Sequence, residues 1–335
     1  MLRWGLLGTA RINRSVIPAI RAAADSRLVA VASRDADCAE AYAGKWHILR
    51  SFGNYEAMIH DPEIDVIYIP LPNHLHASWT IKALEAGKHV LCEKPMALSV
   101  TEMDAISAAA KASGYVATEG FMYRHHPRTE RVRSLVNEGA IGALHFIRGA
   151  FTFRLDRPAD VRWNAAWGGG SLWDVGCYPV HFARYVIGSE PIEVFARQVT
   201  GESGVDVTFA GVARFPGDVL FQFDAGIRSR FRMEMEFVGN KGTIVVPRAF
   251  KPDREGIIQI YDASNDEARI TSVPGSEQLY LGEINDMARA ICEGEQPRVS
   301  LLDSRANVRV LEALAASAHE GRLVRLAEEQ RPDGW

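Results

Sequence analysis

The sequence predicts an α/β dinucleotide-binding (Rossmann) domain followed by an α+β domain with a large, mostly antiparallel open sheet. Strand and helix patterns alternate over residues 1–120, which is typical of a parallel sheet with helices on both faces. From residue 144 onward, short strand-like segments follow one another with tight turns, as in an antiparallel sheet. At 335 residues the chain is long enough for two domains, which we place at residues 1–122 and 123–335.

In the first domain each expected strand is short and apolar, and a helix usually follows it. The segment 64–71 (IDVIYIPL) is continuously apolar, as expected for a parallel strand buried on both faces. The expected strands are 3–8, 28–33, 64–71, 88–92 and 115–119, and the expected helices are 12–24, 36–46, 75–86 and 99–113.

The second domain begins with an amphipathic helix that ends near Gly139. The expected strands are 144–153, 193–200, 207–215, 219–225, 230–238, 242–247 and 257–261, and the expected covering helices are 169–187, 277–293 and 302–319. Three helices are too few to cover seven strands, so one sheet face should stay exposed. A large exposed apolar face usually marks an interface, and we therefore expect a homodimer or homotetramer.

Composition argues against several classes of protein. Hydrophobic residues make up 47% and charged residues 24%, as in an ordinary soluble globular protein. The net charge of −4 gives no footprint for nucleic acid or an anionic membrane. No apolar run approaches about 18 residues, and no secretion signal is evident. The four cysteines form no CxxC pair, so we expect no metal knuckle and a cytoplasmic location.

The first strand–helix turn, residues 8–13 (GTARIN), lies where dinucleotide-binding folds carry G-x-G-x-x-G. Gly8 can form the tight turn, and Ala10 is small enough for a backbone close to a pyrophosphate. The helix start at Ile12 offers free N–H groups and a positive dipole end. Asn13 stands where the third glycine or alanine is usual, so a plain tight turn is the alternative.

The end of the second strand discriminates between nicotinamide cofactors. NAD-specific sites usually place Asp or Glu there to bind the ribose 2′-hydroxyl, whereas this chain has Ser33-Arg34. A guanidinium and a hydroxyl suit a 2′-phosphate. We therefore expect NADP, although Asp35, one residue later, leaves NAD possible.

Lys94 follows the expected strand 88–92, at the edge where open α/β sheets bind ligands. Pro95 pushes the lysine to an extended conformation and so restricts its direction. The alternative is a solvated loop lysine. At the end of the strand before it, Asn73 could cap a helix, and His76 could be structural or could contact a ligand.

A second constellation lies on the expected helix 169–187. Asp174, Tyr178 and His181 are spaced i, i+4 and i+7, so an α-helix places them on one face. Three glycines, 168–170, precede the helix and allow a close backbone approach. The alternative is a partly exposed helix with a satisfied Asp–His pair, and the spacing is a poor match to known zinc motifs.

The segments GKHVLCEKP, PNHLH, EGFMYRHHP and GGGSLWDVGCYPV, in this order and spacing, resemble the Gfo/Idh/MocA oxidoreductase family over essentially the whole chain. Tyr178, where many members have histidine, resembles the branch of glucose–fructose oxidoreductase, NADP-linked xylose dehydrogenase and dihydrodiol dehydrogenase. The resemblance implies a Rossmann domain, an open-sheet substrate domain and hydride transfer with a nicotinamide cofactor. It also implies that Lys94 is the catalytic lysine and that Asp174 and Tyr178 bind substrate and transfer a proton.

The resemblance and the turn positions together give the expected cofactor-binding and substrate residues. The cofactor set is Gly8, Thr9, Ala10, Arg11, Ile12, Ser33, Arg34, Leu71, Pro72, Asn73, His76, Glu93, Lys94, Arg162, Trp163 and Tyr280. The further substrate set is Tyr123, Arg124 and His181.

These observations predict an NADP-dependent dehydrogenase or reductase that acts on a carbinol carbon of an aldose or cyclic diol. Tyr178 would take the hydroxyl proton, and the Lys94 ammonium within about 4–6 Å would favour the phenolate, since a free tyrosine titrates near ~10. Asp174 would anchor a neighbouring hydroxyl. The alternatives are a non-catalytic NADP-binding sensor or repressor, and a metal-dependent hydrolase using Asp174, His181 and His125.

Overall fold

The computed structural model describes residues 1–327, which fall into two compact units. The first unit consists of Met1–His125 and Ser276–Arg305, and the second of His126–Gly275 and the chain from Ala306 onward. The segment from Ser276 to Arg305 thus belongs with the amino-terminal part of the chain, a grouping that patterns along the sequence do not reveal.

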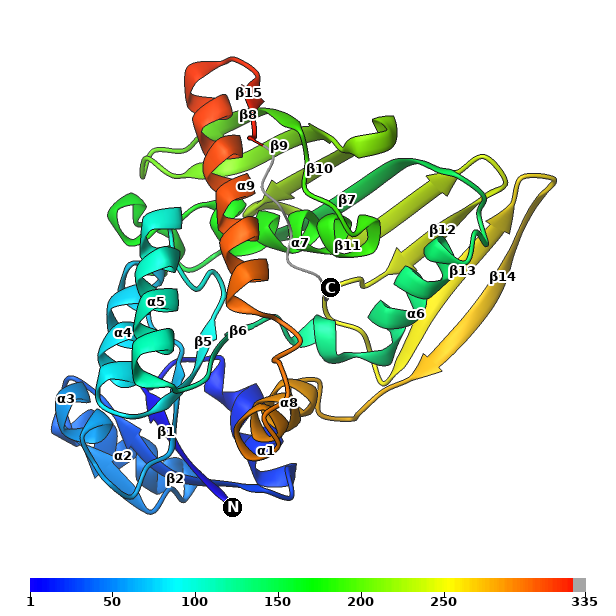
Figure 1. Cartoon of the computed structure of the whole chain (residues 1–335). Helices are drawn as coiled ribbons and strands as arrows, with labels where there is room; N and C mark the ends of the chain where they lie inside the picture. Colours follow the sequence, from blue (N-terminus) through cyan, green and yellow to red (C-terminus); the bar gives the residue numbers. More distant parts are fainter. Residues whose placement is uncertain (328–335) are drawn as a thin grey trace. The chain divides into compact units, whose positions relative to one another are not determined.

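The first unit contains a six-stranded parallel sheet in the order β3-β2-β1-β4-β5-β6. Figure 1 labels its strands β1, β2, β5 and β6. The strands are β1 (Leu2–Leu7), β2 (Ser26–Ala32), β3 (Arg50–Phe52), β4 (Val66–Ile69), β5 (His89–Glu93) and β6 (Ala117–Gly120). The strand order reverses between β1 and β4, and the carboxyl edge at such a switch point is where these sheets bind ligands. The predicted Rossmann architecture is confirmed.

The helices of the first unit are α1 (Asn13–Ala22), α2 (Ala36–Trp46), α3 (Tyr55–Ile59), α4 (His76–Glu85), α5 (Val100–Ser113) and α8 (Leu281–Cys292). Three of them, α2, α3 and α5, begin at side-chain caps. Ser99 caps α5 by accepting the Glu102 N–H, while the Glu102 carboxylate accepts the Leu98 N–H, which is a capping box. Gly114 ends α5 in the left-handed region.

Three details of the first unit differ from expectation. The short elements β3 and α3 were not predicted, although Asn54 caps α3 through the Ala57 N–H and offered a local signal. The helix expected at 277–293 packs as α8 against α1, so it does not cover the large sheet. An apolar helix face can pack on another helix or on a sheet, and the sequence pattern of the helix does not distinguish the two.

The second unit contains a nine-stranded sheet in the order β14-β13-β12-β11-β7-β10-β9-β8-β15. Among the described residues, its only parallel pair is β7 with β10. The strands are β7 (Leu144–Arg154), β8 (Glu193–Thr200), β9 (Asp206–Arg214), β10 (Leu220–Gly226), β11 (Arg228–Gly239), β12 (Gly242–Pro247), β13 (Glu255–Asp262), β14 (Asn265–Pro274) and β15 (Val324–Arg325). The mostly antiparallel sheet is confirmed, and β14 and β15, both at its edges, were not predicted.

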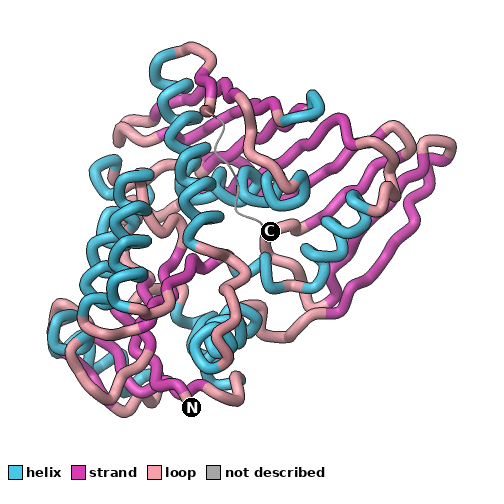
Figure 2. Tube along the Cα trace, in the orientation of Figure 1, coloured by secondary structure: helices cyan, strands magenta, loops and turns pink. Residues whose placement is uncertain are grey.

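Helices cover one face of this sheet. Helix α6 (Pro127–Asn137) packs on β13 and β14, and α7 (Cys177–Ile187) packs on β7 and β10 (Figure 2). The part of α9 (Leu301–Glu320) that belongs to this unit packs on β8 and β9, where the Ser317 hydroxyl accepts the Ala196 N–H. Burial alternates along β9 and β10, so successive side chains point to the helices and to solvent in turn.

Candidate active site

The turn after β1 meets the demands of a phosphate-binding loop. Gly8 has φ of 123°, which L side chains rarely adopt, and a Cβ there would lie 3.2 Å from Leu71 Cδ2. In the described structure, the backbone N–H groups of Thr9, Ala10 and Ile12 have no hydrogen-bond acceptor. They stand at the N-terminal end of α1, which carries partial positive charge, so the turn fits a dinucleotide pyrophosphate.

Asn13, at the position of the missing third glycine, supports this turn from inside. It is fully buried, and its Nδ2 donates to the carbonyl oxygen of Gly8 at 2.9 Å. The side chain therefore holds the glycine in place, which a glycine at position 13 could not do. Arg11 is exposed on the outer side of the turn.

At the end of β2, Asp35 is engaged by the helix that follows. Its Oδ1 accepts the Cys38 N–H at 2.8 Å as the N-cap of α2, and this bond lowers the pKa of Asp35. Arg34 is exposed beside Tyr55, where it opposes the burial that raises the pKa of that phenol. The predicted contacts of Ser33 and Arg34 with an adenosine ribose stay predictions.

Lys94 directly follows β5, and two buried side chains hold the turn that contains it. The Lys94–Pro95 peptide bond is cis. His76 Nδ1 lies 2.7 Å from the Pro95 carbonyl oxygen, and Glu119 Oε1 accepts the Met96 N–H at 2.9 Å. Both His76 and Glu119 are 1% exposed. The direction of the lysine is therefore set by groups from α4 and β6 as well as by the proline.

His76 connects the ends of two strands. Its Nε2 lies 2.6 Å from the carbonyl oxygen of Leu71, which follows β4, while its Nδ1 faces Pro95 after β5. Burial lowers the pKa of His76 to about 4, so the ring is neutral and donates to one of these two oxygens. With both nitrogens engaged, a direct cofactor contact by His76 stays a prediction.

Asn73 does not occupy the helix-capping position that was considered for it. Asn73 is the first residue of a 3-10 turn, η1 (Asn73–Leu75), that follows Pro72. The N-cap of α4 is Leu75, which offers no side-chain acceptor, so the capping interpretation of Asn73 is wrong. The predicted cofactor contact of Asn73 stays a prediction.

A buried acid–phenol cluster lies beside Glu93. The Tyr68 hydroxyl donates to Glu93 Oε1 at 2.7 Å, and Tyr280 is buried beside the same carboxylate, with a raised pKa that comes mainly from its burial. Glu283, which the sequence analysis did not single out, is 1% exposed and neither of its oxygens is hydrogen-bonded. Burial and the neighbouring Glu93 raise the pKa of Glu283 well above its ordinary value.

In the second unit, the three consecutive glycines lie close to the chain's own backbone and to Asp206. Gly168 and Gly170 have φ of 72° and 108°. A Cβ on Gly169 would lie 2.4 Å from the Arg162 carbonyl oxygen, and one on Gly170 would lie 2.0 Å from Asp206 Oδ1. The predicted close approach is therefore present, and internal packing explains it.

Asp206, at the start of β9, anchors the segment that these glycines introduce. Its Oδ2 accepts the Ser171 hydroxyl at 2.6 Å and the Leu172 N–H at 2.8 Å. Ser171 is fully buried and Asp206 is 9% exposed. A carboxylate from a distant strand thus satisfies the free donors at the start of the next helical segment.

That segment begins as a π-helix, η5 (Leu172–Gly176), and continues as α7. The Cys177 N–H bonds to the Leu172 carbonyl oxygen, five residues back. Pro179 has no N–H to offer to the preceding turn, which was a sequence signal for irregular geometry. The prediction of a regular α-helix from residue 169 is therefore wrong, because the helical segment begins near Leu172 and its first turn is a π-helix. That Asp174 and Tyr178 share one face stays a prediction.

Asp174 is held by an ion pair that the sequence did not suggest. Arg162 Nε donates to Asp174 Oδ2 at 2.6 Å, and its NH1 donates to Asp160 Oδ1 at 3.0 Å. The two carboxylates raise the pKa of Arg162, led by the charge of Asp174. The predicted cofactor contact of Arg162 stays a prediction, while its described partners connect the 155–168 loop to the π-helix.

Trp163 packs within the same loop. Its indole N–H donates to the Arg157 carbonyl oxygen at 2.9 Å, and the Arg228 guanidinium lies 5.7 Å from its ring centroid. The ring also packs on an apolar cluster that includes Val207 and Ile227. Trp163 thus supports the loop in the described structure, and its predicted cofactor contact stays a prediction.

Tyr178 lies in an aromatic setting that fixes its ring. It is 3% exposed, and its ring centroid is 5.4 Å from that of Phe151 and 5.3 Å from that of Phe250. Aromatic contacts at these distances restrict ring orientation. The structure therefore gives this phenol a defined direction.

The three residues expected to contact substrate directly are buried. His181 and Tyr123 are 0% exposed. Arg124 is 7% exposed, and its NH2 donates to the Arg298 carbonyl oxygen at 3.2 Å. Their predicted contacts with substrate remain untested, and the geometry favours supporting roles in packing.

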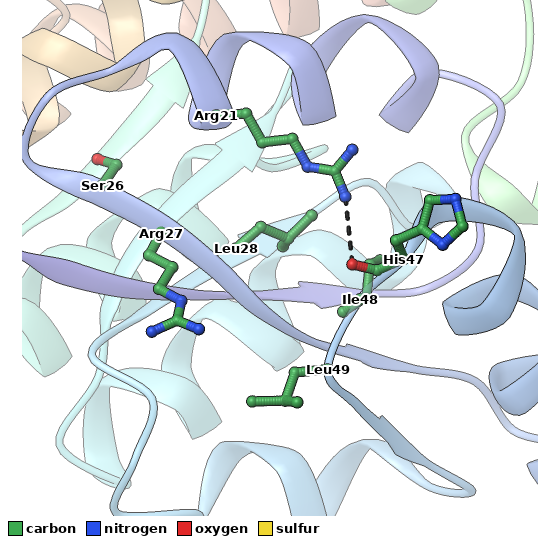
Figure 3. A pocket seen from close by; sticks show the side chains of 7 residues that line it. All are labelled: Arg21, Ser26, Arg27, Leu28, His47, Ile48 and Leu49. Atoms are coloured by element: carbon green, nitrogen blue, oxygen red, sulfur yellow. Dashed lines mark hydrogen bonds between the residues drawn. The ribbon is translucent and has the colours of Figure 1, made fainter.

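A hollow of about 400 Å³ lies in the first unit at the edge opposite the turns described above (Figure 3). It is bounded by the carboxyl ends of α1 and α2 and the start of β2. Its Arg21 guanidinium donates to the Trp46 carbonyl oxygen and caps the end of α2. Its lining residues are Arg21, Ser26, Arg27, Leu28, His47, Ile48 and Leu49. Because its arginine caps a helix, we do not assign this hollow a ligand.

Over residues 1–327, no group of three or more His, Cys, Asp or Glu side chains is arranged to hold a metal ion. The metal-dependent hydrolase considered above therefore lacks its ligand cluster in the described structure. None of the described helices combines the length and apolar character that crossing a membrane requires. Cys38, Cys92, Cys177 and Cys292 are all free thiols.

Comparison with known families matches both parts of the chain. Residues 2–121 match the family described as "Oxidoreductase family, NAD-binding Rossmann fold", and residues 129–245 match the "GFO/IDH/MocA C-terminal domain".

Individual relatives are similar to this chain along nearly its full length. An uncharacterized oxidoreductase of Rhizobium meliloti is 36% identical over 96% of this chain and 98% of its own. An NADP(+)-dependent D-xylose 1-dehydrogenase of Haloferax volcanii is 35% identical over 97% of this chain and 100% of its own. The structure of a 3-ketoreductase from Actinomadura kijaniata, solved with NADP and TDP-benzene, is similar with a TM-score of 0.89 at 30% identity, over 94% of this chain and 97% of that one.

Proposed function

The chain belongs to the Gfo/Idh/MocA oxidoreductase family, and from this premise we propose that it transfers a hydride between NADP and a carbinol carbon of a sugar or cyclic diol. Relatives that match at least 73% of this chain are named as a xylose dehydrogenase, sugar 3-reductases and dihydrobenzenediol dehydrogenases. All of these names describe oxidation or reduction at a hydroxyl-bearing or keto carbon.

The first unit would hold the cofactor. The unpaired N–H groups of Thr9, Ala10 and Ile12 would bind the pyrophosphate, and Arg34 with Ser33 would bind the 2′-phosphate. The commitment of Asp35 to the cap of α2 is the observation that supports NADP over NAD. When bound, the nicotinamide supplies the hydride acceptor or donor.

The second unit would hold and deprotonate the substrate. In the oxidation direction the carbinol carbon loses a hydride to the cofactor, and its hydroxyl proton passes to Tyr178 Oη, so that a carbonyl forms. Lys94, the cation proposed for this step, would favour the phenolate form of the tyrosine. Asp174, oriented by Arg162 at 2.6 Å, would accept a hydrogen bond from a neighbouring hydroxyl and so select the reacting carbon.

The experiment that tests this proposal is Tyr178→Phe. The phenyl ring keeps its packing against Phe151 and Phe250, so fold and NADPH binding should persist. Turnover should fall about 10²- to 10⁴-fold, the usual contribution of general acid–base catalysis. Initial rates with NADP⁺ and NAD⁺ would be measured on a panel of aldoses, polyols and cyclic diols.

The matched control is Tyr185→Phe on the same helix, where the lost hydroxyl donates to Glu130 and no catalytic role is proposed. Its turnover should stay within about threefold of the original chain. Near-normal rates for Tyr178→Phe would remove the tyrosine from the mechanism. NADPH binding without turnover on any panel member would favour the sensor or repressor alternative.

Cofactor preference is tested by Arg34→Ala. Removing one charge-assisted contact should weaken NADP⁺ binding by about 1.5–3 kcal/mol and leave NAD⁺ nearly unchanged. Fluorescence titration with both cofactors gives the comparison within one variant. Equal losses for the two cofactors would mean that Arg34 does not read the 2′-phosphate.

One face of the large sheet carries exposed apolar side chains that bear on the assembly of the protein. On the sheet face turned away from the helices, Val199, Val212, Leu220 and Ile270 are 46–63% exposed. We assign this face to a homodimer or homotetramer interface in a cytoplasmic enzyme. Light scattering at micromolar concentration should give a multiple of the 37.0 kDa chain mass, and a monomeric mass would exclude the assembly.

A further inference from the structure

A buried carboxyl group lies directly behind the turn that carries Lys94. Glu119 sits on β6 opposite Cys92 of the neighbouring strand β5, and it is 1% exposed. Its Oε1 accepts the Met96 N–H at 2.9 Å, and its Oε2 has no hydrogen-bond partner. The lysine's turn therefore satisfies one oxygen of this carboxyl group. The Ser304 hydroxyl lies close enough to favour the charged form, but it makes no hydrogen bond of ordinary geometry to the other oxygen.

The groups facing Glu119 come from two elements. Lys94 and the Cys92 thiol approach from β5 and the turn after it, and Asp303 and Ser304 approach from the first turn of α9 within the same unit. Burial is the largest influence and, with the charge of Asp303, raises the pKa of Glu119 to about 7. The Ser304 hydroxyl, the Met96 N–H and the Lys94 charge oppose the rise.

We propose that Glu119 is a positioning residue for Lys94, which fixes the lysine's direction through the Met96 N–H and stabilises its ammonium by the carboxylate charge. This inference rests on the proposed function only for its effect on turnover. Its consequence for Lys94 itself holds in the free protein, without substrate or cofactor.

A carboxyl group at position 119 differs from other hydrogen-bond acceptors in the charge that it can carry. A neutral amide or a backbone carbonyl would satisfy the Met96 N–H equally well, and burying an acid with one donor is unfavourable. What the carboxylate adds over those groups is its charge, and the cation beside it is Lys94. Because the pKa of Glu119 is raised to about 7, the charge beside this turn also depends on pH near neutrality.

The test is the titration of Lys94 by NMR in the full chain with isotopically labelled lysine, assigned with Lys94→Arg. In the original protein the Lys94 signal should show an inflection near pH 7, as Glu119 gains or loses its proton. In Glu119→Gln, whose amide oxygen still accepts the Met96 N–H, the inflection should vanish and the lysine midpoint should fall by about one pH unit or more. NADPH affinity of this variant at pH 8 should stay within about threefold.

The matched control is Glu102→Gln, which also removes a carboxylate that accepts a backbone N–H, that of Leu98 in the adjoining segment. It should leave the Lys94 titration unchanged. Glu119→Asp, which keeps the charge but has a shorter reach, should keep the inflection and weaken NADPH binding. An unchanged midpoint and a retained inflection in Glu119→Gln would overturn the proposal, whether or not Lys94 takes part in turnover.

Discussion

Glu119 in the first unit and Asp206 in the second are buried acids with similar tasks and different surroundings. Each comes from a strand and accepts hydrogen bonds from a segment that carries a proposed functional side chain, Lys94 or Asp174. Glu119 has one N–H donor and an unpartnered oxygen, whereas Asp206 Oδ2 accepts both a hydroxyl and an N–H.

Burial raises the pKa of both groups, but it raises that of Glu119 to about 7, and the hydrogen bonds to Asp206 restrain its rise. The comparison indicates that hydrogen-bond donors oppose the effect of burial on the pKa of an acid. The hydroxyl and the N–H that bind Asp206 restrain the rise of its pKa, whereas the pKa of Glu119 reaches about 7.

The largest effect is expected from Asp206→Ala. Losing the carboxylate leaves the Leu172 N–H buried without an acceptor and leaves the Ser171 hydroxyl with the Ala225 carbonyl oxygen at 3.4 Å, which should lower the free energy of unfolding by about 3–4 kcal/mol. Asp206→Asn keeps one acceptor oxygen and should cost about half as much. Urea unfolding followed by circular dichroism gives both values.

Asp224→Ala is the control, because Asp224 pairs with Arg232 on the exposed side of the same sheet. A surface ion pair contributes about 0–1 kcal/mol. If Asp206→Ala costs no more than this control, Asp206 is not an anchor and the comparison fails.

The next effect concerns pH and Glu119. Its pKa rises from 4.5 in the unfolded chain to about 7 in the folded protein, so the folded state binds more protons between these values. The stability that Glu119 contributes is complete below pH 4.5 and is lost as the pH rises through 7. Relative to Glu119→Gln, the original protein should lose about 3 kcal/mol between pH 4.5 and pH 8.

Urea unfolding of both proteins at several pH values measures this difference. Asp206→Asn, compared in the same way, should show a smaller pH dependence, because the hydrogen bonds to Asp206 restrain its pKa. Parallel stability curves for the original protein and Glu119→Gln would show that Glu119 does not titrate in this range.

Much of the first unit could be predicted from the sequence because its determinants are local. Buried parallel strands such as β4 read as apolar runs, and Asp35 and Ser99 are ordinary caps within four residues of their donors. The positions of Gly8, Arg34 and Lys94 at strand ends followed from the same patterns. The assignment of α8 to this unit could not be predicted, because the pattern of an amphipathic helix does not indicate which element its apolar face packs against.

The supports of the site could not be predicted because their partners are distant in sequence. Asp206 lies 35 residues from Ser171, Glu119 lies 23 residues from Met96, and Arg162 lies 12 residues from Asp174. Each is a charged residue that composition alone would place on the surface. Only the folded chain shows which of them are buried and what they hold.

The smallest effect is expected from Asn13, the neutral counterpart of the two acids. Asn13 holds the Gly8 turn through one amide–carbonyl hydrogen bond, so Asn13→Ala should cost about 1 kcal/mol of stability, with no pH dependence between pH 5 and pH 8. NADPH affinity should fall about three- to tenfold, because the turn that offers its N–H groups is less fixed. Asn54→Ala removes the cap of α3 at a similar cost in stability and should leave NADPH affinity unchanged. Equal losses of NADPH affinity in the two variants would mean that Asn13→Ala acts only through general destabilisation. A loss of stability that depends on pH would mean that the pH dependence expected for the two acids does not come from their charge.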